Sequence, residues 1–272
     1  MNVLRTLCRP GVEPLHPGWL TRMNFQSTLP AGAPELQRAS AFRRERASAY
    51  GHLSPTEARS SRLGLLGPSM MQDLLRFETP EGQSELLEVL AACIRHGRNL
   101  LVHLQVVDKA VPLTVFPRDW LVYCAMPMSQ LLATPLCDLQ VIGVEPPQLA
   151  APGASNKAFV GDSKCLAPLG SFLWELALRG SRATLLPEIA GQAAYRIAPG
   201  ANLRSLQLTG SIATAVDKLQ RQTCNLAEIA RWPSFNRERA MRLLNALYLQ
   251  ACLMIRRTNP AATNEHWTSD PA

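Results

Sequence analysis

The chain has 272 residues, of which 47% are hydrophobic, 18% charged and 6% aromatic. This length and composition exclude a wholly disordered protein and are sufficient for one large or two modest domains. The formal net charge of +7 permits an anionic partner without requiring one. The 7 cysteines are too few and too scattered for a disulfide framework, so we expect buried thiols in a reducing compartment.

The charge is distributed unevenly along the chain. Residues 1–62 carry a net charge of +5, residues 63–150 carry −4, and residues 151–272 carry +6. The middle of the chain is therefore acidic, and a test for an anionic partner belongs at the C-terminal segment.

Residues 1–62 are rich in proline and arginine and show little apolar periodicity, which predicts a leader without fixed structure. Met23, followed by Asn-Phe-Gln-Ser, is a candidate for the true start of translation. The arginine-rich composition also fits an organelle transit peptide, or a coding preference for arginine over lysine. Pro10 and Pro17 interrupt the place of a secretory signal, and no apolar run is long enough to span a membrane. We therefore expect a soluble, cytoplasmic protein.

Residues 63–145 are predicted to form a small α+β domain. Apolar residues at helical spacing predict helices over 69–77, 84–96 and 127–133. Short β-branched or aromatic runs predict an antiparallel meander and a fourth strand, over 100–107, 111–116, 120–124 and 139–144. The acidic helix and the free sheet edge suit partner binding, and a purely structural role fits them equally.

Residues 146–208 are predicted to contain a linker, two helices and two short strands. Residues 146–157 combine prolines with small residues and predict a linker. An apolar stripe from Leu166 predicts a helix that ends at Gly180, followed by a helix over 181–189 that Pro187 bends. Two short strands are predicted over 193–198 and 203–208.

The C-terminal segment carries the most informative pattern. Apolar spacing and the caps Asn225 and Asn236 predict three helices, over 211–220, 226–230 and 236–251, with Trp-Pro-Ser-Phe as the turn before the last. This order is typical of a helix-turn-helix unit. The run Asn-Leu-Ala-Glu-Ile-Ala-Arg-Trp-Pro-Ser-Phe-Asn-Arg-Glu-Arg-Ala-Met-Arg-Leu-Leu-Asn-Ala-Leu-Tyr-Leu from Asn225 onwards resembles the winged-helix families.

The resemblance implies further elements. It implies that residues 253–257 form the first strand of a wing, although Pro-Ala-Ala-Thr at 260–263 predicts no returning strand. An α+β unit followed by a helix-turn-helix unit also resembles uncharacterised bacterial regulators.

A helical wheel of 236–251 predicts two different faces. The core face holds Ala240, Leu243, Leu244, Leu247 and Ala251, and the opposite face holds Glu238, Arg239, Arg242, Ala246, Leu249 and Gln250. On that second face Arg239 and Arg242, around Ala246, could read bases in a major groove, with Arg237 on a phosphate. Alternatively, Glu238 and Arg242 form a surface ion pair, and an exposed Leu249 suits a protein contact. The predicted partner-binding or DNA-binding residues are Arg237, Arg239, Arg242 and Leu249.

Signals for catalysis and cofactors are weak. Cys93 and His96 are potential metal ligands that lie three residues apart, and His103, Cys124 and Cys137 are candidates for the remaining ligands of such a site. Alternatively, the cysteines are buried free thiols. We find no nucleophile elbow, phosphate loop or dinucleotide motif. The prediction therefore names no catalytic residue, metal or cofactor, although scattered catalytic residues would leave no motif.

The sequence predicts an α+β protein, with a small antiparallel-sheet domain followed by a mostly helical, winged-helix-like domain. The predicted boundaries are a leader over 1–62, domains over 63–145 and 158–258, the linker 146–157 between them, and a disordered tail over 259–272. The predicted function is that of a non-enzymatic regulatory or adaptor protein that binds a protein partner. The alternatives are a DNA-binding transcriptional regulator and a metal- or cysteine-dependent enzyme.

Overall fold

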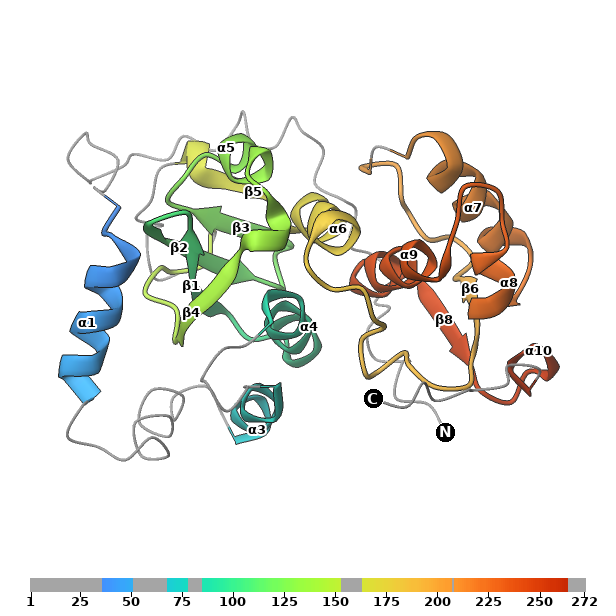
Figure 1. Cartoon of the computed structure of the whole chain (residues 1–272), viewed down its shortest axis with the longest axis horizontal. Coiled ribbons are helices and arrows are strands. Elements are labelled where there is room, and N and C mark those ends of the chain that lie inside the picture. The colour runs from blue at the N-terminus through green and yellow to red at the C-terminus, as the bar shows by residue number, and fades with distance from the viewer. Residues whose placement is uncertain (1–35, 51–67, 78–84, 153–162, 207, 264–272) are drawn as a thin grey trace.

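The computed structural model of the chain describes residues 36–50, 68–77, 85–152, 163–206 and 208–263. The protein is α+β, as predicted, and its two sheets lie on opposite sides of a layer of helices (Figure 1). In the described part of the chain, no helix is long and apolar enough to cross a membrane.

The first sheet has five strands in the order β4-β1-β2-β3-β5, all antiparallel to their neighbours. Its strands are β1 (Leu100–Val106), β2 (Lys109–Phe116), β3 (Leu121–Cys124), β4 (Gln140–Glu145) and β5 (Leu166–Pro168). Side chains alternate between its faces, so that Val102 and Leu113, which pair across β1 and β2, lie in the core. The predicted meander and fourth strand are confirmed. β5 was predicted as the start of a helix.

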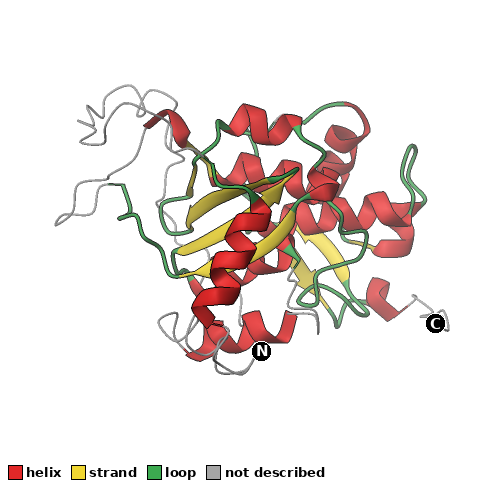
Figure 2. Cartoon of the chain, turned by 60° about the vertical axis from the view of Figure 1, so that its left-hand side comes forward, coloured by secondary structure: helices red, strands yellow, loops and turns green. Residues whose placement is uncertain are grey.

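Helices cover both faces of this sheet. On the core side lie α4 (Leu86–His96), which ends at Gly97 with a φ of 58°, and α6 (Leu169–Arg179). Gly97 accepts this left-handed conformation because it has no Cβ. On the outer side α1 (Ala39–Tyr50) runs across the strands (Figure 2). The remaining helices near the sheet are α3 (Pro68–Phe77), α5 (Met128–Ala133) and the short 3₁₀ helix Leu136–Asp138.

The second part contains the three helices predicted near the C-terminus. Its helices are α7 (Gly210–Arg221), α8 (Leu226–Ala230), α9 (Arg237–Leu249) and α10 (Pro260–Thr263), and its strands are β6 (Ala194–Ile197), β7 (Cys224–Asn225) and β8 (Leu253–Arg256). Asn225 caps α8 in a capping box with Glu228, and the side chain of Asn236 accepts the Arg239 N–H at the start of α9. The three predicted helices and their caps are confirmed.

The strand that pairs with β8 comes from before the three helices. β6 lies between β7 and β8 and pairs antiparallel with both, Tyr195 opposite Ile255. The sequence after β8 offers no returning strand, and α10 follows there instead. A strand therefore forms at Leu253–Arg256, within the predicted range 253–257, and its pairing partner comes from an upstream segment.

Most buried apolar side chains form one core that continues from the first sheet through α4 and α6 to α9, and Phe116 and Leu166 form a small second cluster. β5 and α6 follow the predicted linker, and both pack with the first sheet: β5 as its edge strand, and α6 through fully buried residues such as Phe172 and Leu173. The predicted domain boundaries remain a prediction, but the core does not stop at residue 145.

Four other predictions need correction. Residues 39–50 of the predicted leader form α1, because contacts with the sheet stabilise a helix that has little apolar periodicity of its own. Residues 260–263 of the predicted tail form α10. Residues 181–189 form no helix, since their backbone polar groups bond to the side chains of Arg182 and Asn245. Residues 203–206 and 208 form no strand. Met23, residues 51–62 and residues 264–272 lie outside the described residues.

Candidate partner interface at the turn between α8 and α9

The predicted binding residues separate into two pairs. Arg237 and Arg239 are exposed at the N-terminal end of α9. Arg242 is largely covered, and Leu249 is 1% exposed. The structure therefore does not bring the four residues onto one surface.

The turn between α8 and α9 is closed by its own backbone. The N–H of Phe235 donates to the carbonyl of Trp232 over 3.0 Å, and Pro233 and Ser234 occupy the two central positions. Ser234 has a φ of 64°, the left-handed conformation that a type II turn requires at its third position. The guanidinium of Arg239 donates to the Ser234 carbonyl over 2.8 Å, which ties the start of α9 to the turn.

Two cations lie over the two aromatic rings of this turn. Lys218 Nζ, on α7, is 5.1 Å from the ring centroid of Trp232, and Arg239 Cζ is 5.2 Å from that of Phe235. The two rings meet edge to face at 6.2 Å and 78°. Both distances fall within the range of cation–π attraction, and the edge-to-face arrangement is favourable for aromatic pairs. Each side chain is therefore fixed by a neighbour while its surface remains partly accessible.

We call this region the basic–aromatic surface, and its members are Lys218, Arg231, Trp232, Phe235, Arg237 and Arg239. Residues 190–263 contain ten Lys and Arg but three Asp and Glu. Of the nearby acids, Glu228 accepts from the N–H of Asn225, and Glu238 pairs with Arg242 at 2.9 Å. Glu228 and Glu238 are thus engaged in local contacts, and bases outnumber acids around the surface.

The opposite face of α9 is covered, which corrects the predicted exposure of Leu249. Arg242 donates to the carbonyls of Leu178 and Gly180 at the end of α6, over 3.2 and 2.5 Å. Ala246 is fully buried. The wheel assigned these positions to a solvent face because a single helix does not reveal a second packing partner. The predicted ion pair between Glu238 and Arg242 is confirmed.

Asn245 holds the covering segment in place. Its side-chain oxygen accepts the Leu186 N–H over 2.9 Å, its amide donates to the Thr184 carbonyl over 2.8 Å, and it is fully buried. Gln250 makes a similar bond to the Gly170 carbonyl of α6. The middle of α9 is therefore enclosed by α6 and residues 180–186, and the exposed part of the helix is its N-terminal end.

Two arginine clusters also join residues 180–190 to α4. Arg182 binds both Glu85 and Glu88, with 2.6 Å between its Nη1 and Glu88 Oε1. Arg95 binds Glu188. Burial raises the pKa of Glu85; Arg182 lowers it and Glu88 raises it further. These ion pairs therefore connect residues 180–190 to α4.

The potential metal ligands do not converge. Cys93 Sγ donates to the carbonyl of Arg98, whereas His96 Nε2 lies 2.7 Å from Asp73 Oδ2. Within the ranges that the structure covers, no three His, Cys, Asp or Glu side chains are placed to hold a metal ion. Burial raises the pKa of Cys124 to about 11, so its thiol stays protonated.

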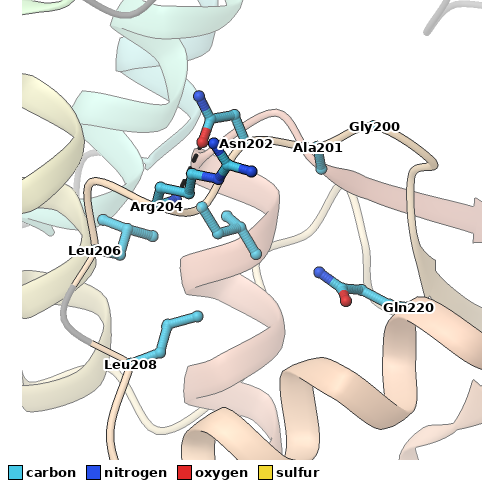
Figure 3. Close-up of a pocket in the computed structure, with 8 residues that line it drawn as sticks. Gly200, Ala201, Asn202, Arg204, Leu206, Leu208 and Gln220 are labelled. Carbon is cyan, nitrogen blue, oxygen red and sulfur yellow. Dashed lines mark hydrogen bonds between the residues drawn. The ribbon is translucent and has the colours of Figure 1, made fainter. Parts of the chain in front are cut away.

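A wide, open pocket of about 600 Å³ lies between the 200–208 loop and α7 (Figure 3). Leu203, Leu206 and Leu208 line it, together with Arg204 and Gln220. Among the described residues that line it, Arg204 is the one ionisable side chain, so the pocket offers no acid–base pair for catalysis.

Comparisons of the chain with protein-family models, with curated proteins and with solved structures found no match. The sequence pattern identified Arg237 and Arg239 but missed Lys218, Trp232 and Phe235. The available signal was two aromatic residues in a polar turn, whose neighbours in space come from another helix.

Proposed function

We propose that the protein is a cytoplasmic, non-enzymatic adaptor that binds an acidic segment of a protein partner at its basic–aromatic surface. The observation that carries the proposal is which parts of α9 are covered and which are exposed. Its middle is enclosed by α6 and residues 180–186, while its N-terminal end and the preceding turn present cations beside accessible aromatic rings.

This combination of groups suits a peptide with alternating acidic and apolar side chains. Carboxylates of such a partner pair with Arg231, Arg237 and Arg239, and an apolar side chain packs on the edge of Trp232 or Phe235. Tryptophan and arginine dominate the energetics of protein interfaces because they combine large contact area with polar groups. The fixed positions of the rings and of Arg239 reduce the entropy lost on binding.

The test compares one charge change on the surface with an equal change elsewhere. R237Q/R239Q removes two charges from the basic–aromatic surface, and R204Q/R256Q removes two exposed charges outside it. The probe is a fluorescein-labelled peptide of alternating Glu and Phe, and fluorescence anisotropy measures its binding to the full chain. We expect R237Q/R239Q to weaken binding about tenfold, which corresponds to about 1.4 kcal/mol, and R204Q/R256Q to change it less than twofold.

A second arm uses a 20-base-pair DNA duplex over a series of salt concentrations. The DNA-binding alternative predicts tight duplex binding that falls steeply with salt and is lost in R237Q/R239Q. That result, or equal loss of peptide binding in both double variants, would refute the proposal. A peptide of the same charge without aromatic residues should bind more weakly, because the rings then contribute nothing.

A further inference from the structure

Two cysteines lie where β3 meets the edge strand β5. Cys124 is the last residue of β3, and Cys165 directly precedes β5, at the end of the 3₁₀ helix Ser163–Cys165. The two strands pair antiparallel, with Tyr123 opposite Leu166. This register, extended by one pair, places Cys165 opposite Cys124.

The same pattern places both side chains on one face of the sheet. Val122 and Cys124 belong to the main core, and Ala167, which pairs with Val122, packs against it. Leu166 faces the other side, in the second cluster with Phe116. Successive residues of a strand alternate between the two faces, so the position before Leu166 returns to the side of Cys124.

The spacing at this position suits a disulfide. At the other end of the pairing, the Leu169 N–H donates to the Trp120 carbonyl over 2.9 Å. Hydrogen-bonded pairs recur at every second residue of an antiparallel ladder, so Cys124 and Cys165 occupy a position of the same kind, where Cα atoms are about 5.5 Å apart. Disulfides most often join Cα atoms about 5.5–6 Å apart. The two thiols can therefore be joined with little movement of the strands.

The thiol of Cys165 is also close enough to influence that of Cys124. Burial is the largest cause that raises the pKa of Cys124 to about 11; a backbone hydrogen bond at Met126 lowers this pKa, and Cys165 raises it. A neighbouring ionisable group has such an effect only at short range. Cys124 is 0% exposed, whereas Cys165 is half-buried. An oxidant dissolved in water therefore reaches Cys165 first.

We propose that Cys165 is an oxidation-sensing thiol, which forms a reversible disulfide with Cys124 when it meets a peroxide. In the first step the Cys165 thiolate attacks one oxygen of hydrogen peroxide, the O–O bond breaks, hydroxide leaves, and Cys165 becomes a sulfenic acid. In the second step the Cys124 sulfur attacks the Cys165 sulfur, the S–O bond breaks, and hydroxide leaves again. The two hydroxides take up the two thiol protons as water, and the two sulfur atoms lose two electrons to the peroxide.

The disulfide would connect segments on the two sides of the predicted linker 146–157. β5 leads directly into α6, whose last turn accepts hydrogen bonds from Arg242 of α9. Oxidation therefore fastens the start of α6, the helix that covers α9, to the first sheet. In a reducing compartment disulfides of this kind are transient and report the redox state, so a thiol reductant reverses the link. The inference does not depend on the basic–aromatic surface.

The test treats the full chain with hydrogen peroxide, blocks the remaining thiols with N-ethylmaleimide, and identifies linked peptides by mass spectrometry without reduction. We expect the wild type to give a peptide that contains Cys124 linked to Cys165, and dithiothreitol to remove it. In C124A the Cys165 sulfenic acid should persist and react with dimedone at least tenfold more than in the wild type. In C165S, which changes a half-buried position, Cys124 should remain a thiol.

C137S is the matched control, because Cys137 is the exposed cysteine among the described residues, and this variant should form the link as the wild type does. Amide hydrogen exchange over 166–173 should slow at least tenfold on oxidation of the wild type and of C137S, and stay unchanged in C165S.

Three results would overturn the proposal. The first is a disulfide that joins Cys165 to another cysteine or to a second copy of the chain. The second is oxidation of Cys165 to the sulfinic acid without the linked peptide, because Cys124 would then be out of reach. The third is a linked peptide without slower exchange over 166–173, because the link would then not fasten α6.

Discussion

The enclosure of α9 makes a quantitative prediction for Asn245→Ala. Asn245 is fully buried, and its side chain bonds to the Leu186 N–H and the Thr184 carbonyl. The truncation leaves the Leu186 N–H buried without a partner, which costs about 1–3 kcal/mol. The Thr184 carbonyl keeps a second donor, the Nε–H of Arg182, so the loss of the Asn245 bond there costs about 0.5–1 kcal/mol. We therefore expect a total loss of about 1.5–4 kcal/mol in the free energy of unfolding.

Urea denaturation followed by circular dichroism measures this loss. The matched control is Asn236→Ala on the same helix, where the exposed side chain caps the Arg239 N–H, and an N-cap contributes about 1 kcal/mol. In a thermal scan, Asn245→Ala should lower the Tm by about 3–16 °C, since each kcal/mol shifts the Tm of a protein of this size by about 2–4 °C.

A loss below that of Asn236→Ala would refute the reasoning. It would mean that residues 184–186 do not depend on Asn245 and that the middle of α9 can open. The DNA-binding alternative would then regain its recognition helix, because Arg242 and Ala246 would be accessible.

Three further predictions concern the fold. Ala251 follows α9 with a φ of 54°, a conformation that glycine adopts more easily than alanine. Ala251→Gly should therefore raise the free energy of unfolding by about 0.5–1 kcal/mol, as measured by urea denaturation. A lower free energy of unfolding would contradict the assigned conformation. Burial raises the pKa of Glu85, so the folded state binds the proton of this carboxyl more tightly than the unfolded state does. The free energy of unfolding of the wild type should therefore fall relative to that of Glu85→Gln as the pH rises above about 4.5. A difference that does not change with pH would disprove this. Iodoacetamide should modify the exposed Cys137 before the buried Cys124, because burial raises the pKa of the Cys124 thiol to about 11. Peptide mass spectrometry gives the order of modification. The reverse order would show that β3 is not packed as described.

The candidate site was only half visible in the sequence. Arg237 and Arg239 follow directly from the N-cap Asn236, since a helix start with exposed cations is a local pattern. Lys218 belongs to the same surface only because α7 packs beside the turn and places its ammonium group over Trp232. No spacing rule connects residues of different helices, so this contact was not predictable.

The same limit explains the wrong exposure of Leu249. A helical wheel orders residues around one axis and identifies one apolar stripe, here that of Leu243 and Leu247. It cannot show that α6 approaches the opposite side, where Ala246 and Leu249 are also apolar and are buried. Both apolar faces were present in the sequence, but only one was interpreted as core.

The sequence by itself determined the local elements. Periodicity located α4, α7 and α9, and β-branched runs located β1 to β4 of the first sheet. Asn225 and Gly97 marked helix ends. These signals depend on neighbouring residues alone. The tertiary structure alone decided three features: the pairing of β6 with β8, the enclosure of α9 by α6, and the docking of α1 through Arg46 and Glu145. Each joins segments far apart in the chain, and their contact energy exists only once the intervening chain has folded.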